Sequence, residues 1–373
     1  MATGSGSTSV YEDHIMLQDL SRELFPGCQI QLLANQGACS TTFALRHTKN
    51  DEVCHRILQF RQPSFDLNMN LMAKAKLVYG AYVSSVQRHD ISSLLAQHIS
   101  IPPTVCYEMD VIPGVTFKSI APVGPCLTGA EMRRQENLVR DFAGFVALGW
   151  PAKEMEQPVC DGKVGSRIPQ KLRVLAEQLP YRQHRAVTQT ILDKLPSLAQ
   201  LPVIVNHGDT IPSNIMCDPE TGRLTGVVDW AEAEYLPFGT CLYGLEHFLG
   251  RWSSSTRRDS AIGYQRFIPY DSASDLRRLF WQTLRSNVPA LQADDSLMKL
   301  VVMAKTIGTL LWYGFAWDGG AIDRVITPER DMEELIYLDA FLDNARDYES
   351  LTSASLERKN STAPALVYLH GEP

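Results

Sequence analysis

Residues 207–214 read HGDTIPSN, and residues 224–230 read LTGVVDW. The first stretch follows a β-branched run and places Asn214 five residues after Asp209, a gap that predicts a loop whose two ends face one point. The second stretch predicts a strand that is joined to the first through the turn residues PETGR and brings Asp229 beside the loop. Each residue alone is typical of a turn or a helix cap, but the ordered set indicates a chemical site.

Two carboxylates and an amide in this order fit phosphoryl transfer. That reaction needs a carboxylate that orients the acceptor hydroxyl and takes its proton, together with one or two divalent metals held by a fixed frame. The oxygens of Asn214 and Asp229 suit Mg²⁺, which accepts few protein ligands and keeps several waters. We expect His207 to brace the loop through hydrogen bonds to backbone carbonyls rather than to take part in the chemistry.

The His-Gly-Asp triplet, the following Asn, the hairpin and the Asp before an aromatic residue resemble the signature of the aminoglycoside phosphotransferase and choline kinase-like family, relatives of the protein kinases. The continuation AEAEYLPFGTCLYGLEHFLG is similar to the fungal branch of this group. The likeness covers roughly residues 29–345 in layout and is specific between about 200 and 250. The resemblance implies a two-lobe α+β fold of the protein-kinase type, ATP and Mg²⁺ as cofactors, Asp209 as the catalytic base, and Asn214 and Asp229 as metal ligands.

The chain of 373 residues is long enough for two domains, and its pattern changes near residue 115. Residues 1–115 are expected to form a small, β-rich, nucleotide-binding lobe in which residues 1–13 are a loose tail. Residues 116–373 are expected to form a larger, mostly helical lobe that carries the loop and the hairpin and ends in a loose tail of about 15 residues. The expected strands of the first lobe are 29–34, 41–47, 54–61 and 104–112, with a helix at 67–87, and the main expected helices of the second lobe are 131–150, 168–179, 275–287 and 298–317.

The nucleotide-binding lobe departs from the family pattern. A kinase places a Lys on a strand and a Glu on the following helix, where the two form a pair that holds the phosphates. The strand CHRILQFR offers Gln59 and Arg61 instead, and the helix after it carries Lys74 and Lys76 but no acid. Gln59 and Arg61 share one strand face, and Arg61 is the candidate cation for phosphate. The alternative is an exposed Arg at the end of a strand.

Two further segments are candidates for nucleotide binding. The stretch NQGACSTTF could set Gly37 and Ser40 against phosphate, or it could form a plain hairpin turn. In VCYEMDVIPG, the backbone around Glu108 and Met109 is expected to bind adenine, as the family's connector between the lobes does. The alternative for this second segment is an ordinary edge strand.

Acidic and aromatic residues follow Asp229. The carboxylates of Glu232, Glu234 and Glu246 could hold an ammonium group of the substrate, and Trp230 could line an aromatic pocket. Alternatively, the two nearer acids belong to a solvated helix start, and the Trp belongs to the core.

The composition, with 45% hydrophobic and 21% charged residues, fits a soluble globular protein. A net charge of −7 argues against nucleic acid or an anionic membrane as a partner. The eight Cys are scattered without a CxxC pair, which is typical of free thiols in a reducing compartment. The N-terminus carries no signal-peptide pattern, so a cytoplasmic location is expected. The sequence does not indicate an oligomeric state.

These features predict an ATP- and Mg²⁺-dependent phosphotransferase, a kinase that acts on a hydroxyl group of a small molecule. The missing Lys–Glu pair keeps two alternatives open, because a fold does not fix a function. One is a repurposed kinase-like protein that binds a metabolite in the same cleft, either without turnover or with non-phosphoryl chemistry such as acid-base-assisted cyclisation. The other is a scaffold that binds other proteins.

Overall fold

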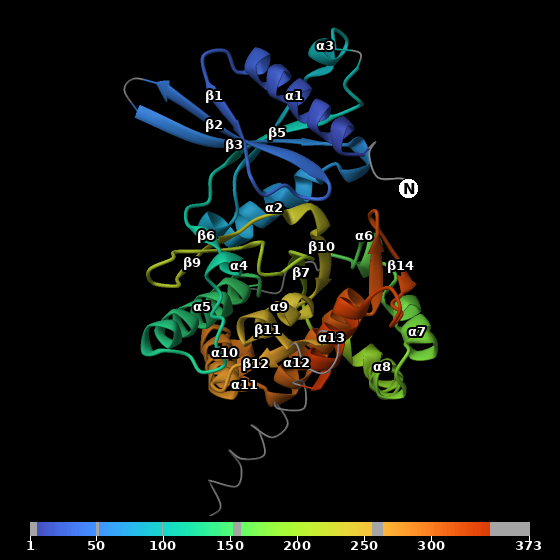
Figure 1. The fold of residues 1–373 in the computed structure, drawn as a ribbon. Coiled ribbons are helices and arrows are strands. Elements are labelled where there is room, and N and C mark those ends of the chain that lie inside the picture. Colours follow the sequence, from blue (N-terminus) through green and yellow to red (C-terminus); the bar gives the residue numbers. More distant parts are fainter. Residues whose placement is uncertain (1–5, 50–51, 99, 152–157, 256–263, 344–373) are drawn as a thin grey trace, which may run out of the picture.

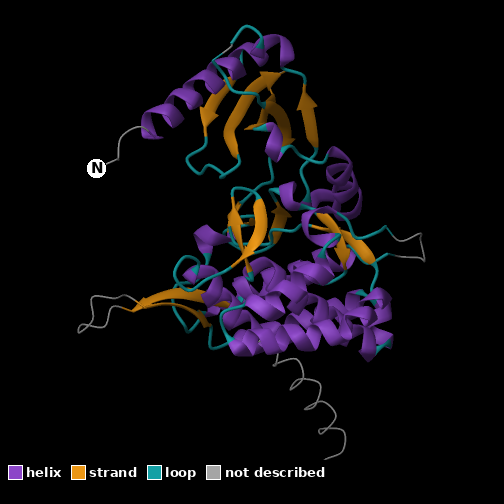
Figure 2. Ribbon diagram, turned by 90° about the vertical axis from the view of Figure 1, so that its right-hand side faces the viewer, coloured by secondary structure: helices purple, strands orange, loops and turns teal. Residues whose placement is uncertain are grey.

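The computed structural model describes residues 6–49, 52–98, 100–151, 158–255 and 264–343. A β-sheet crossed by a long helix forms the upper part of the molecule, and helices form most of the lower part (Figure 1). The same division is visible after a turn of 90° (Figure 2). The two-lobe α+β fold expected from the sequence is therefore confirmed. We call residues 6–110 the N-lobe and the described residues from 115 onward the C-lobe, and a domain boundary at residue 115 stays a prediction.

The N-lobe sheet is antiparallel and has the strand order β1-β2-β3-β5-β4. Strand alternation sets its two faces: Leu58 and Phe60 of β3 pack into a core with Leu20 of helix α1, whereas Gln59 and Arg61 lie on the opposite face. The strands are β1 Gln29–Leu32, β2 Ser40–Lys49, β3 Glu52–Arg61, β4 Val86–His89 and β5 Val105–Asp110, and the helices are α1 Gly6–Leu24, α2 Met69–Tyr79 and α3 Ser92–Leu95.

Two expectations for the N-lobe need correction. Residues 6–13, predicted as part of a loose tail, are the first part of α1. The helix predicted at 67–87 ends at Tyr79, because Gly80 adopts a positive φ of 57° that a continuing helix does not allow. Of the remaining residues of that prediction, Gly80–Tyr82 form a 3₁₀ turn and Val86 begins β4.

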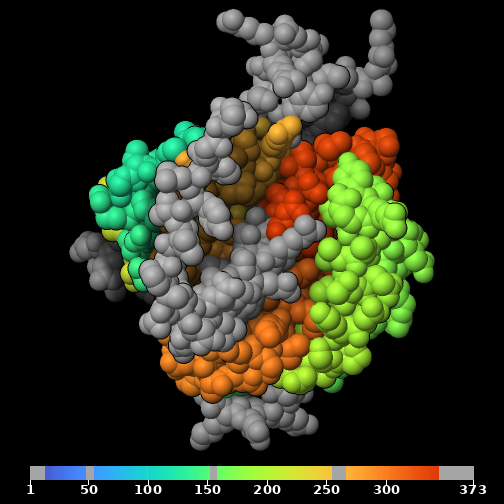
Figure 3. Space-filling model, turned by 90° about the horizontal axis from the view of Figure 1, so that it is seen from below, coloured from blue at the N-terminus to red at the C-terminus, as the bar shows by residue number. Residues whose placement is uncertain are grey.

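The C-lobe helices pack around α12, which is buried along most of its length. Viewed from below, α7 and α8 (yellow-green) lie beside α10 to α12 (orange) and α13 (red) (Figure 3). The helix predicted at 298–317 ends at Tyr313 and a strand follows, so its last residues were assigned wrongly. The helices are α4 Phe117–Ile120, α5 Gly129–Leu148, α6 Gly162–Gly165, α7 Ile168–Gln178, α8 Arg182–Lys194, α9 Gly244–Phe248, α10 Ala273–Asn287, α11 Pro289–Ala293, α12 Asp295–Tyr313 and α13 Met332–Asp343.

The short strands β6 to β10 lie on the side of the C-lobe that faces the N-lobe (Figure 1). Strand β7 pairs with β10, and β8 pairs with β6 and β9. Residues 207–214, which we call the HGD loop, connect β7 to β8. The C-lobe strands are β6 Val115–Thr116, β7 Val203–Asn206, β8 Ile215–Cys217, β9 Leu224–Val227, β10 Glu234–Pro237, β11 Gly250–Ser255, β12 Tyr264–Pro269, β13 Phe315–Asp318 and β14 Ala321–Val325.

The lobes are joined by contacts as well as by the chain. The hydroxyl of Tyr79 in α2 donates to the carbonyl of Val205 in β7 over 2.6 Å. On the C-lobe, the hairpin of β13 and β14 reaches the N-lobe, where a Cβ built on Gly320 would lie 2.9 Å from the ring of Phe65. Arg324 holds this hairpin through ion pairs with Asp318 and Asp331. Among the described residues, no helix has the length and apolar character needed to cross a membrane.

Candidate functional site

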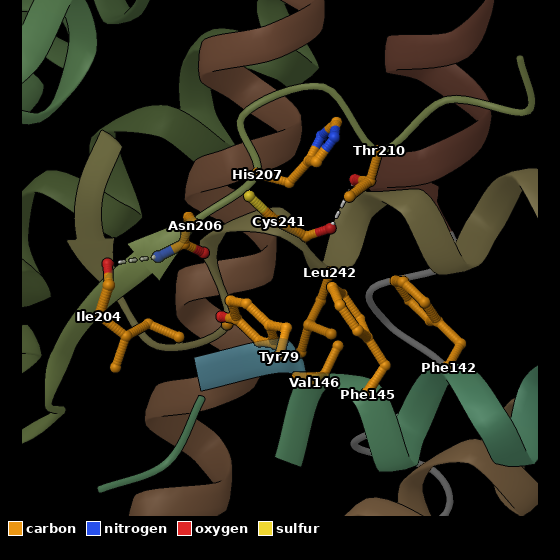
Figure 4. A pocket seen from close by; sticks show the side chains of 11 residues that line it. Tyr79, Phe142, Phe145, Val146, Ile204, Asn206, His207, Thr210, Cys241 and Leu242 are labelled. Carbon is orange, nitrogen blue, oxygen red and sulfur yellow. Dashed lines mark hydrogen bonds between the residues drawn. The ribbon is translucent and has the colours of Figure 1, made fainter. Parts of the chain in front are cut away.

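The backbone of the HGD loop requires glycine at one position and is held by hydrogen bonds from a later segment of the chain. Gly208 has a φ of 80°, and a Cβ at this position would lie 1.9 Å from the carbonyl oxygen of Glu232. The hydroxyl of Tyr243 donates to the Gly208 carbonyl (3.0 Å) and accepts the N–H of Thr210 (3.2 Å). The Thr210 hydroxyl in turn donates to the carbonyl of Cys241 (2.8 Å; Figure 4). The loop is thus fixed by the segment that follows β10.

His207 braces the loop, as expected from the sequence. Its Nε2 bonds to the carbonyl of Val228, and its Nδ1 accepts the N–H of Asp209 at 3.1 Å. The first bond, of 2.8 Å, connects the loop directly to the residue before Asp229. Burial lowers the pKa of His207 to about 4, so the ring is neutral near pH 7. Both ring nitrogens of His207 are thus used to hold the HGD loop against the end of the hairpin that carries Asp229.

Asp209 and Asn214 meet at the two ends of the loop. The amide nitrogen of Asn214 donates to the Asp209 carboxylate (2.8 Å) and to its carbonyl (3.0 Å). Because the nitrogen is used in this way, the amide oxygen of Asn214 is the group available to a metal. Burial, followed by the charge of Asp229, raises the pKa of Asp209 to about 7, and a bound cation would oppose this rise.

Asp229 is held at the same end of the hairpin as Asn214. The N–H of Val228 bonds to the carbonyl of Asn214 (2.9 Å), and β8 pairs with β9 so that Ile215 faces Val227. Asp229 has a φ of 59° and is the one residue other than glycine with positive φ in the described parts of the chain. Such a conformation is strained for Asp, and strain of this kind is common at functional sites.

The N-lobe brings three predicted nucleotide-binding residues toward Asp229. Arg61 is 3% exposed, which excludes the alternative of a solvent-facing Arg at a strand end. Its guanidinium lies 3.6 Å from the Asp229 carboxylate and donates to Gln59 (2.9 Å) and to the carbonyl of Phe65 (2.7 Å). Gln59 donates to the Ser40 hydroxyl over 3.1 Å. A continuous polar chain therefore runs from Asp229 into the sheet.

Gly37 belongs to the same region, because it pairs with Ser40 across the turn before β2. The expectation for Glu108 and Met109 needs correction. Both residues lie in β5, which has β3 on one side and β4 on the other, so the sheet uses their backbone. The Glu108 carboxylate bonds to His89 over 2.9 Å. The connector that could offer free backbone groups begins two residues after Met109, at Val111, where β5 has ended.

Three of the four predicted substrate residues are used by the fold. Trp230 is 5% exposed and its indole donates to the carbonyl of Val227, so it belongs to the core. Glu246 is 0% exposed and is paired with Arg277 and Lys305, so a substrate cannot reach it.

Glu234 needs the same correction, because it is 7% exposed and accepts backbone N–H groups of α6. The side chain of Glu232 is 26% exposed and lies 3.5 Å from Lys163. Of the four predicted substrate residues, Glu232 is the one that remains accessible.

Sequence reasoning missed the part that Tyr243 and Cys241 play in fixing the HGD loop. No local pattern marks them, because the fold brings them back to the loop from more than 30 residues away. Behind the loop lies a cavity of about 20 Å³ whose lining includes Phe142, Phe145 and Leu242 (Figure 4). It has room for a water molecule at most and is not a substrate site.

The donor set fits Mg²⁺ better than a transition metal. The described residues contain no group of three or more His, Cys, Asp or Glu side chains that could hold a metal ion. An amide oxygen from Asn214 and a carboxylate from Asp229 are hard oxygen ligands, and Mg²⁺ commonly takes one or two carboxylates, substrate phosphates and waters. We therefore regard these two residues as a candidate Mg²⁺ site that a nucleotide would complete.

Residues 166–240 match the sequence profile of the family described as "Phosphotransferase enzyme family". No curated protein sequence matches the chain. Among solved structures, the chain is similar to the choline kinase LicA of Streptococcus pneumoniae, with 13% identity over 88% of this chain and 99% of that chain and a TM-score of 0.46.

The chain is also similar to an aminoglycoside phosphotransferase of Streptomyces rimosus in complex with ADP and streptomycin, with 12% identity over 88% of this chain and 98% of that chain and a TM-score of 0.40. A third similar structure is an ethanolamine kinase of Plasmodium vivax, with 8% identity over 83% of this chain and 82% of that chain and a TM-score of 0.46. A relation to the fungal branch stays a prediction. The resemblance to the phosphotransferase enzyme family is confirmed over residues 166–240, the segment that contains the HGD loop and Asp229.

Proposed function

We propose that this protein is an ATP- and Mg²⁺-dependent phosphotransferase that acts on a hydroxyl group of a small molecule. The observation that carries the proposal is the position of Arg61. This buried cation of the N-lobe lies 3.6 Å from Asp229, which shares one end of a hairpin with Asn214 and Asp209. Phosphates that are removed from water need cations to compensate their negative charge, and Arg61 and a metal at Asp229 would supply them from opposite sides.

In the proposed reaction, Asp209 orients the acceptor hydroxyl and takes its proton as the oxygen forms a bond to the γ-phosphorus. The bond from that phosphorus to the β-phosphate oxygen breaks, and ADP leaves with the electron pair. Asn214 and Asp229 would hold Mg²⁺, which supplies neutralisation of the phosphate charge. Arg61 would bind a phosphate oxygen, and His207 keeps Asp209 in place through the hydrogen bond between its ring and the Asp209 N–H.

Mg-ATP should raise the melting temperature of the protein. A ligand that binds only the folded state at 100 times its Kd adds about 2.7 kcal/mol to the free energy of unfolding. Asp229→Ala should abolish the shift and leave the free protein folded, because this side chain is 43% exposed and is not part of the core. Differential scanning fluorimetry with Mg-ATP, ATP plus EDTA, and Mg-GTP measures the effect.

The matched control is Asp193→Ala, which removes an exposed carboxylate from α8, outside the site. This variant should keep the full shift. If neither ATP nor GTP nor ADP with millimolar Mg²⁺ stabilises the wild-type protein, phosphoryl transfer is ruled out.

Arg61→Ala should weaken ATP binding roughly 10- to 100-fold, which is the usual value of a hydrogen bond to a charged group. Arg61→Lys should restore part of the affinity, since the charge returns without the planar fork. Isothermal titration with Mg-ADP measures both changes. Arg56→Ala is the control, because Arg56 lies on the same strand and is paired with Asp110 instead. Equal ADP affinities for Arg61→Ala and wild type would contradict the role of Arg61.

One observation favours the second candidate function, a repurposed cleft that binds a metabolite. The described helix α2 carries no acid to hold Arg61, and the guanidinium contacts Asp229 directly. In this alternative, the Arg61–Asp229 pair would close the phosphate position, and Asp209 would act as an acid or base on a metabolite. The titration with Mg-ADP separates the two functions, because the second predicts no nucleotide binding.

A further inference from the structure

Helix α6 is held in place by a buried carboxylate. Glu234, at the start of β10, accepts the N–H groups of Lys163 (2.5 Å), Val164 (3.0 Å) and Gly165 (2.8 Å). Gly162 precedes them with a φ of 105°, and a Cβ there would lie 2.3 Å from the Glu234 carboxyl carbon, so the close approach requires glycine. Three backbone donors on one carboxylate fix the position of α6 relative to β10.

This arrangement fixes the backbone of Lys163 and leaves its ammonium group accessible. The side chain is 47% exposed, and its Nζ lies 3.5 Å from the Glu232 carboxylate. Arg167 donates to the carbonyl of Lys163 and pairs with Asp323 of the β13–β14 hairpin, so the segment is supported from both sides. A weak, exposed ion pair of this length is easily exchanged for a ligand.

Glu232, the partner of Lys163, lies beside the HGD loop. The backbone of Glu232 packs directly against Gly208, the residue before Asp209, because a Cβ on Gly208 would lie 1.9 Å from the Glu232 carbonyl oxygen. Helix α6 lies at the top of the C-lobe, toward the N-lobe (Figure 1).

In the described part of the chain, most carboxylates near Lys163 are already used by the fold and are not available to an amine of the substrate. Glu234 is used by α6, Glu246 is buried between two cations, and Asp323 is paired with Arg167 and Lys171. Of the other carboxylates beside Lys163, Asp161 is exposed and accepts the N–H of Gly162, and Glu232 is accessible and lies opposite the ammonium group itself. An ammonium group on the acceptor would meet the cation of Lys163 at this position.

We propose that Lys163 binds a carboxylate of the acceptor, so that the substrate of this phosphotransferase is a hydroxy acid and not an amino alcohol or aminoglycoside. This inference rests on the proposed function and concerns the other substrate of the same site. On binding, the acceptor carboxylate would replace Glu232 as the partner of Lys163 and direct the hydroxyl toward Asp209. The phosphates remain with Arg61 and the metal ligands.

The test uses matched acceptors that differ only in charge. The first set is 4-(hydroxymethyl)benzoate, 4-(hydroxymethyl)benzamide and 4-(hydroxymethyl)benzylamine. The second set is 4-hydroxybutanoate, 4-hydroxybutanamide and 4-aminobutan-1-ol. ADP release with Mg-ATP gives kcat/KM for each compound. The wild-type protein should prefer the acid over the amine at least about tenfold in one set or both, as expected for a charge-assisted contact.

Lys163→Met should remove this preference by raising the KM of the acid, and Lys163→Glu should reverse it toward the amine. The control, Lys194→Glu, changes the net charge equally at an exposed position at the end of α8 and should keep the wild-type preference. The stabilisation by Mg-ATP should be the same in wild type, Lys163→Met and Lys194→Glu, which also shows that the variants are folded.

The inference would be overturned if the wild type preferred the amines, if it used all compounds equally or used none, or if the acid preference survived Lys163→Met. In each of these cases, stabilisation by Mg-ATP would leave the proposed function standing. A fall in ATP affinity for Lys163→Met with the acid preference intact would assign Lys163 to the nucleotide phosphates and would also overturn the inference. Absence of any Mg-ATP stabilisation in the wild type would overturn the proposed function itself.

Discussion

Replacing Asp209 by Asn should lower kcat on the order of 10²-fold or more while the affinity for Mg-ATP stays nearly unchanged. The substitution keeps the size of the side chain and its contact with Asn214, but it removes the group that would take the proton of the acceptor. Because Asp209 is a candidate base and not a candidate metal ligand, the loss should fall on turnover and not on nucleotide binding. Single-turnover kinetics and a titration with Mg-ADP measure the two quantities separately.

The control for Asp209→Asn is Asp193→Asn, which makes the same chemical change on the exposed surface of α8. Wild-type turnover in Asp209→Asn would show that another group takes the proton. An equal loss of turnover and of ADP affinity would instead make Asp209 part of the nucleotide site.

Glu246→Gln should lower the free energy of unfolding by about 3–5 kcal/mol, the usual cost of removing one partner from a buried ion pair. Glu246 is fully buried, with Arg277 at 2.8 Å and Lys305 at 2.5 Å, and the amide would leave both cations without its charge. Urea unfolding followed by tryptophan fluorescence gives the value. Glu329→Gln, at an exposed position, should change it by less than about 0.5 kcal/mol, and a similarly small change in Glu246→Gln would show that water reaches the cluster.

The same carboxylate should make stability depend on pH. Burial by itself would raise the pKa of Glu246, but the charges of Lys305 and Arg277 outweigh burial and lower the pKa from 4.5 to about 2. A lowered pKa in the folded state means that the stabilisation is complete above pH 4.5 and is lost as the pH falls from 4.5 toward 2. The Glu246→Gln variant should therefore lose less stability than the wild type over this interval.

The sequence predicted the parts of the site that lie within one local pattern. The HGD loop, the hairpin that carries Asp229 and the face shared by Gln59 and Arg61 all follow from spacing and strand alternation, and the structure has all three. Strand alternation predicts the face of the sheet on which Arg61 lies, but the distance from Arg61 to Asp229 depends on how the two lobes pack.

The rest depends on contacts between distant residues, which spacing does not reveal. Glu234 and Glu246 have the same charge as Glu232 and lie near it in the sequence, yet backbone donors of α6 hold the first and cations of α10 and α12 hold the second. The predicted helix at 298–317 extends too far for a different reason: the apolar run of α12 continues through Gly314 into the residues that form β13, so hydrophobicity alone does not mark the end of the helix.

The contact between Gly320 and Phe65 gives the β13–β14 hairpin the role of a spacer. The carbonyl of Phe65 accepts a hydrogen bond from Arg61, so the tip of the hairpin lies against the segment that helps to hold Arg61 near Asp229. A strand grows by about 3.3 Å for each added residue, and one extra residue in each of β13 and β14 would hold the lobes farther apart by a comparable amount. A change in the length of this hairpin could therefore change the size of the substrate that fits between the lobes without altering any residue that contacts the substrate.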